Sequence, residues 1–140
     1  MLIFVVISVL ALTSTALAED RTWSAGGDGT SWSDEENWFP EDVPMLTDDV
    51  TIDDEDASPV CDETFSAKSI IIGGQETSKL TIEKFIYGQI KPASTSDTAI
   101  SNRKGGTILL KGVGIITVHG KYEDSESSLT PEPSFLFWVE

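Results

Sequence analysis

The chain has little cysteine, histidine or positive charge. Its 140 residues include one cysteine, Cys61, one histidine, His119, and 9 basic against 24 acidic residues, a formal net charge of −15. A single cysteine excludes an internal disulfide, so Cys61 is either a buried apolar residue or the partner of a cysteine in another chain. The negative charge opposes association with polyanions, and we therefore expect no nucleic-acid partner.

The motifs that identify common enzyme classes are also missing. The sequence contains no GxSxG, HExxH, Walker or dinucleotide-binding fingerprint. One histidine cannot build a histidine-rich metal site, and no serine or cysteine motif supports a catalytic triad with His119. The many carboxylates do not single out a pair for glycosidic chemistry. We therefore expect a non-enzymatic protein.

The N-terminus has the pattern of a secretory signal peptide. An apolar run from Leu2 to Leu12 is followed by Ala16-Leu17-Ala18, an A-x-A cleavage site. A membrane anchor is the alternative, but the run is short for a span and no basic cluster follows it. We therefore predict a signal peptide over residues 1–18, a secreted or cell-surface protein, and no membrane span after cleavage.

The rest of the chain is predicted to be all-β. No window has apolar residues at helical spacing, whereas several have alternating or β-branched runs. These runs predict strands at 49–53, 69–74, 79–83, 107–112 and 115–120, and a polar loop over 92–106. Residues 85–87 either continue the strand at 79–83 or begin the next one. Short strands that end in glycine favour a short right-handed β-helix or solenoid-like module over residues 19–122, with a β-sandwich as the alternative. Residues 123–140 are expected to be an acidic, proline-containing linker and an apolar C-terminal strand.

Three tryptophans lie in the loop-like stretch 21–47. Ser33 and Glu36 have the spacing of a capping box, which predicts one helical turn between Trp32 and Trp38. Together with Trp23, these tryptophans could form a ligand-binding platform. However, a small domain without disulfides needs the area that buried indoles supply, so packing is the favoured interpretation.

The acidic segment TDDVTIDDEDAS is a candidate metal site. It holds Asp48, Asp49, Asp53, Asp54 and Asp56, and Ca²⁺ takes six to eight oxygen ligands from such loops. The EF-hand pattern is not met, and neither is the glycine-rich nonapeptide of calcium-binding β-rolls. A solvated acidic loop is therefore favoured, with Ca²⁺ as the one possible cofactor.

Residues 22–120 resemble the N-terminal region of large secreted bacterial and archaeal β-helix proteins. The resemblance is carried by Trp23, Gly26–Gly29, the WSDEENW run from Trp32 to Trp38, Val43-Pro44, and the strand from Asp48 to Ile52. The chain is similar, more loosely, to the eight-glycine extracellular domain of animal and protist surface proteins. Both resemblances imply a tryptophan-rich N-terminal cap on an extracellular β-helix-like module.

The function implied is binding of glycan or protein partners at a cell surface or in an extracellular matrix. Two alternatives are an accessory domain of a polysaccharide-degrading β-helix enzyme and a calcium-dependent adhesive module. No catalytic residue is carried over from the resemblance.

Overall fold

A computed structural model describes residues 17–74, 77–83, 86–111, 114–125, 128–131 and 135–139. The chain is all-β, with one 3₁₀ turn, η1 (Glu35–Asn37). No helix among these residues is long and apolar enough to cross a membrane. The strands are β1 (Asp20–Trp23), β2 (Trp38–Phe39), β3 (Asp49–Ile52), β4 (Val60–Cys61), β5 (Phe65–Ala67), β6 (Ser69–Ile72), β7 (Lys79–Glu83), β8 (Ile86–Ile90), β9 (Thr98–Asn102), β10 (Thr107–Lys111), β11 (Gly114–Val118), β12 (Lys121–Asp124), β13 (Ser128–Pro131) and β14 (Phe135–Val139).

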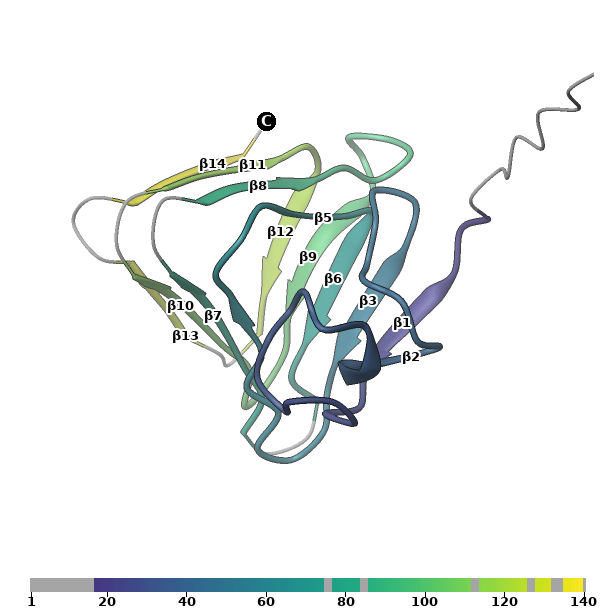
Figure 1. Ribbon diagram of the computed structural model, residues 1–140. Coiled ribbons are helices and arrows are strands. Elements are labelled where there is room, and N and C mark those ends of the chain that lie inside the picture. Colours follow the sequence, from purple (N-terminus) through teal and green to yellow (C-terminus); the bar gives the residue numbers. More distant parts are fainter. Residues whose placement is uncertain are drawn as a thin grey trace, which may run out of the picture.

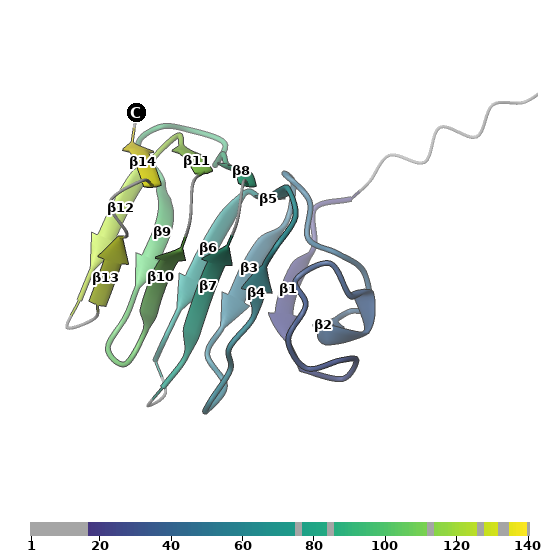
Figure 2. The same ribbon diagram turned by 60° about the vertical axis from the view of Figure 1, so that its left-hand side comes forward.

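The strands form three sheets, which bound a triangular cross-section (Figure 1). Sheet A has the order β12-β9-β6-β3-β1-β2, sheet B the order β13-β10-β7-β4, and sheet C the order β14-β11-β8-β5. From β3 onward, successive strands belong to sheets A, B and C in turn. We call one such set of three strands a circuit, and each circuit lies beside the previous one (Figure 2). The pairing within each sheet is parallel except between β1 and β2. A β-sandwich would have two packed sheets, so that alternative does not describe the arrangement.

The interior is built from columns of aliphatic side chains in register. In sheet A, Val50, Ile70 and Ile100 are aligned on successive strands, and all three are buried. On β3 and β6 the chain neighbours of Val50 and Ile70 are only partly buried, because side chains alternate along a strand. Burying each such side chain contributes roughly 1.5–3 kcal/mol, and stacking the circuits repeats that contribution.

Glycines stand where the chain turns from one sheet to the next. Gly73, which follows β6, has φ +83°, and a Cβ atom there would lie 2.7 Å from the backbone nitrogen of Gly106. Gly120, between β11 and β12, is crowded by the Asp97 carbonyl oxygen, 2.8 Å from where a Cβ would lie. The runs that end at Gly73 and Gly120 therefore mark corners at which neighbouring circuits approach closely.

Several strands lie where the sequence predicted loop or linker, and β1 and β2 are the first of them because they fall in or overlap the loop-like stretch 21–47. Thr98–Asn102 falls within the expected polar loop, and Lys121–Asp124 and Ser128–Pro131 largely within the expected acidic linker, yet they form β9, β12 and β13. Each pairs in parallel with the strand of the preceding circuit. The ladder of backbone hydrogen bonds orders these polar segments, and their own side-chain pattern does not reveal it. The apolar segment Phe135–Val139 is a strand, as predicted.

Candidate binding face

The three tryptophans of the N-terminal segment are packed inside. Trp23, Trp32 and Trp38 are all buried, and the Trp38 ring lies edge-on to the other two, with centroids 5.0 Å from Trp23 and 4.7 Å from Trp32. Trp38 Nε1 donates a hydrogen bond of 2.8 Å to the Trp32 carbonyl oxygen, and the Trp32 ring meets Phe65 of sheet C. The structure therefore matches the packing interpretation and leaves none of these rings exposed for a ligand.

The turn between Trp32 and Trp38 is helical, as predicted, but its cap is different. Asp34, not Ser33, is the N-cap residue, and its carboxylate accepts a hydrogen bond from the Glu36 backbone nitrogen. Because the turn is a 3₁₀ turn that begins at Glu35, the capping position moves one residue along the chain.

A buried asparagine organises the loop before this turn. Asn37 Oδ1 accepts from the backbone nitrogens of Gly27 and Gly29, and its Nδ2 donates to Asp28 Oδ1 at 2.8 Å. The same Asp28 oxygen accepts from the backbone nitrogens of Ser31 and Thr30. These donors, Ser31 first, lower the pKa of Asp28 to about 2.

Asp48 and Asp49 face opposite sides of sheet A. The buried Asp48 carboxylate accepts from the backbone nitrogens of Glu19 and Met45 and lies 3.6 Å from Arg21 Nε. Asp49 instead points outward and binds Lys68 and Ser69. The hydrogen bond to Asp49 raises the pKa of Lys68. These two candidate metal ligands are therefore separated and bind side chains and backbone groups of the protein.

The remaining acids of the segment lie in the turn between β3 and β4. Asp54 contributes its carbonyl oxygen to Ala57 and Ser78, and Asp56, with φ +63°, accepts a hydrogen bond of 2.8 Å from Thr77 Oγ1. Asp53 is partly exposed. Across the described part of the chain, no three acidic, histidine or cysteine side chains are grouped to hold a metal ion.

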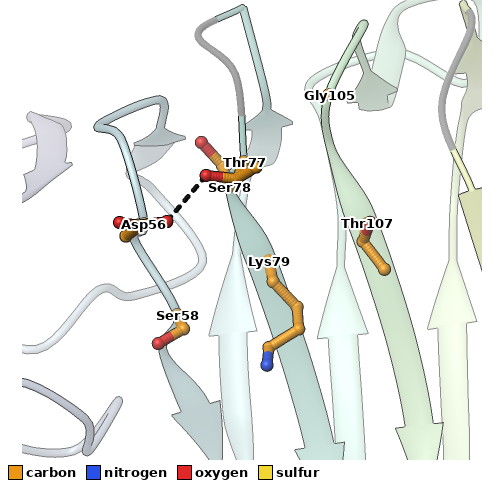
Figure 3. A pocket seen from close by; sticks show the side chains of 7 residues that line it. All are labelled: Asp56, Ser58, Thr77, Ser78, Lys79, Gly105 and Thr107. Carbon is orange, nitrogen blue, oxygen red and sulfur yellow. Dashed lines mark hydrogen bonds between the residues drawn. The ribbon is translucent and has the colours of Figure 1, made fainter.

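Asp56 also borders an open groove of about 390 Å³ on the outside of sheet B (Figure 3). Its lining is polar, with Ser58, Thr77, Lys79 and Thr107 contributed by successive circuits. The Lys79 ammonium points away from Asp56 (Figure 3). Among the described residues that line the groove, none is aromatic, so they offer hydroxyl groups, the Asp56 carboxylate and the Lys79 ammonium but no stacking surface.

Sheet C differs from the other two sheets in charge. Its strands read FSA, IYGQI, GIITV and FLFWV and include none of the chain's 24 acidic residues. Sheet A carries Asp20, Asp49, Glu123 and Asp124 in its strands, and sheet B carries Glu83. The strands of sheet C therefore carry no formal charge on a strongly acidic protein, and the exposed Glu63 lies two residues before β5.

Two exposed apolar side chains lie side by side on this surface. Tyr87 of β8 and Ile115 of β11 are register partners, 51% and 47% exposed. Adjacent strands lie about 4.8 Å apart, so the phenol ring and the aliphatic chain make one continuous apolar strip.

Polar groups border the strip two and four residues further along the strands. Gln89 and Thr117 are the next outward register pair, and Gln89 Nε2 lies 3.5 Å from His119 Nε2. Lys91 follows at the end of β8 and is exposed. An apolar strip beside amide, hydroxyl, imidazole and ammonium groups forms the "sheet C face", defined by Tyr87, Gln89, Lys91, Ile115, Thr117 and His119.

The sequence shows that the strands of the sheet C face lack acidic residues, but it does not show that these strands lie side by side. The segments IYGQI and GIITV are visibly free of acids, yet nothing local shows that they share a sheet and a register. Comparison of the chain with models of known protein families, with curated proteins and with solved structures finds no match. The chemistry of the face therefore has to be inferred from its geometry.

Proposed function

We propose that the chain is an exported, non-enzymatic module with the architecture of a short right-handed β-helix, and that it binds a neutral glycan on the sheet C face. The successive A, B and C strands and the parallel pairing support the architecture. The observation that carries the binding role is the exposed Tyr87 in register with Ile115, on a sheet whose strands carry no acid.

The chemistry of a sugar fits this combination of groups. A pyranose ring presents an apolar C–H face, which packs on an aromatic side chain, and hydroxyl groups at its rim. On the sheet C face, Tyr87 and Ile115 offer the apolar contact, and Gln89, Thr117 and His119 offer donors and acceptors for hydroxyls. A polyanionic glycan is disfavoured by the net charge of −15.

The proposal is tested by titrating the purified protein against neutral polysaccharides and their oligosaccharides in a calorimeter. Tyr87→Ala is expected to weaken binding roughly fivefold to 150-fold, because stacking on an aromatic ring is worth roughly 1–3 kcal/mol by analogy with bases. Leu46→Ala is the matched control, since Leu46 is also exposed, at 41%, but lies outside sheet C.

Two outcomes contradict the proposal. If the Tyr87→Ala and parent proteins bind a glycan with equal affinity, the glycan does not bind on the sheet C face. Capture of a protein, with no affinity for any neutral glycan, assigns the face to a protein partner instead.

A further inference from the structure

Arg21 is surrounded by more negative charge than it can neutralise. Its guanidinium lies 3.0 Å from Glu19 Oε2, 3.6 Å from Asp48 Oδ2 and 3.7 Å from Asp42 Oδ2. Arg21 and Asp48 are buried, whereas Asp42 is half exposed. Among the described residues, Arg21 is the one cation within ion-pair distance of these three carboxylates. A buried carboxylate is costly unless charge pairs and hydrogen bonds offset its desolvation. Asp48 accepts hydrogen bonds from Met45 N and Thr47 Oγ1, and a second cation would stabilise it further.

The backbone nitrogen of Glu19 lies where a second cation would be placed. It donates to Asp48 Oδ1 at 3.2 Å, while the Glu19 carbonyl oxygen accepts from the Asp49 backbone nitrogen at 3.1 Å. Strand β1 begins one residue later, at Asp20. Leu17, 75% exposed, and Ala18 lie outside the strand and in solvent. The Ala18–Glu19 peptide bond therefore joins the exposed Ala18 to a residue whose backbone nitrogen is bound to a buried carboxylate.

We propose that cleavage of the Ala18–Glu19 bond creates an α-ammonium group at Glu19 that pairs with Asp48 and completes this cluster. The inference rests on the export part of the proposed function. A signal-peptidase-class endopeptidase catalyses the hydrolysis: the C–N bond breaks, water supplies the hydroxyl group of the new Ala18 carboxyl, and the Glu19 nitrogen takes up the protons. At neutral pH the net products are a carboxylate on the leader and an ammonium on the mature chain.

The consequence is that processing strengthens the attachment of β1 to β3. The hydrogen bond from the Glu19 amide to the Asp48 carboxylate becomes an ion pair as well, because the donor now carries a positive charge. The ammonium also places a second positive charge, besides that of Arg21, beside the Asp48 carboxylate. Glu19 is exposed, so the two ammonium hydrogens that do not face Asp48 remain accessible to water. Removal of the leader would thus stabilise the edge of sheet A that carries the N-terminal segment.

The experiment compares two forms of residues 19–140, a span that contains all the described strands. One form is released from a fusion protein so that Glu19 is its first residue and carries a free amine. The other form retains Ala18, so that the ammonium group lies on Ala18 and the Glu19 nitrogen remains an amide. Retaining Ala18 is expected to raise the unfolding equilibrium constant roughly fivefold to tenfold in urea titrations. In an Asp48→Asn background the extension should have no effect, whereas in an Asp42→Asn control background its effect should persist.

The inference is overturned if the extension changes stability equally in the parent and Asp48→Asn proteins, or not at all. If Asp48→Asn does not fold, acylation of the Glu19 amine supplies the test. A paired ammonium should react several-fold more slowly in the folded than in the urea-unfolded chain, and equal rates contradict the pairing.

N-terminal sequencing of the full-length chain after export separates the two proposals. Glu19 as the first residue is expected. A different first residue overturns the inference while leaving export intact, whereas a chain that is never exported removes the export part of the proposed function.

Discussion

The ring of Phe65 occupies the space that a side chain at position 88 would need. Phe65 of β5 and Gly88 of β8 are register partners, and a Cβ atom on Gly88 would lie 2.4 Å from Phe65 Cε1. The same ring packs on Trp32, at a centroid distance of 5.4 Å. One glycine thus allows the aromatic cluster of the N-terminal segment to enter the interior beneath sheet C.

Gly88→Ala is therefore expected to destabilise the protein by about 1–3 kcal/mol, the usual cost of overpacking a core. Urea unfolding measures the change. Combining the substitution with Phe65→Leu should cost less than the sum of the two single changes, because the smaller side chain relieves the clash. Strict additivity would show that the two residues do not compete for space.

Trp38→Ala is expected to lower the free energy of unfolding by about 3–5 kcal/mol, because the ring is buried against Trp23 and Trp32. Leu46→Ala, at an exposed apolar residue, should change it by less than about 0.5 kcal/mol. Thermal or urea unfolding of both variants gives the comparison. A Trp38→Ala protein as stable as the parent would contradict the structural role of the cluster.

Asp28 should contribute to the acid sensitivity of the protein. Its pKa is lowered from 3.8 to about 2, so the ionised form is favoured in the folded state. Its stabilisation is complete above the unfolded pKa and is lost as the pH falls through the folded one. The stability difference between the parent and Asp28→Asn should therefore shrink between about pH 4 and pH 2. A difference that stays constant over this range would contradict the hydrogen-bonded carboxylate.

Cys61 should be unreactive in the native protein. The thiol is buried, and burial raises its pKa, so little thiolate is present to react. A disulfide-exchange reagent is expected to label Cys61 only after unfolding. Rapid labelling of the folded chain, or a covalent dimer under non-reducing conditions, would instead support pairing of Cys61 with another chain.

The strands that the sequence predicted are those with a strong local pattern. Asp49–Ile52 and Ser69–Ile72 alternate buried and outward residues, and both lie where expected. Lys121–Asp124 has only exposed or half-buried side chains, so its hydrophobic pattern is absent and its strand depends on pairing with β9. Short strands such as Val60–Cys61 are missed for a similar reason, because backbone pairing with strands of neighbouring circuits holds them in place.

The candidate site was harder to predict than the fold class. The tryptophans were the candidate binding residues in the sequence, yet Trp32 and Trp38 are buried, while Tyr87, which is exposed, lies in a strand with no binding motif. Its significance comes from Ile115, which is far away in the chain but adjacent in register. Only the sheet topology brings these two residues together.

The most direct test of the sheet C face is to map the bound glycan by NMR. Backbone amide shifts of the ¹⁵N-labelled protein are followed while a neutral oligosaccharide identified by calorimetry is added. Shift changes are expected to concentrate at 87–91 and 115–119, with little change at the polar groove around Lys79 and Thr107. Changes confined to that groove or to the loop at 24–37, with sheet C unaffected, would contradict the account.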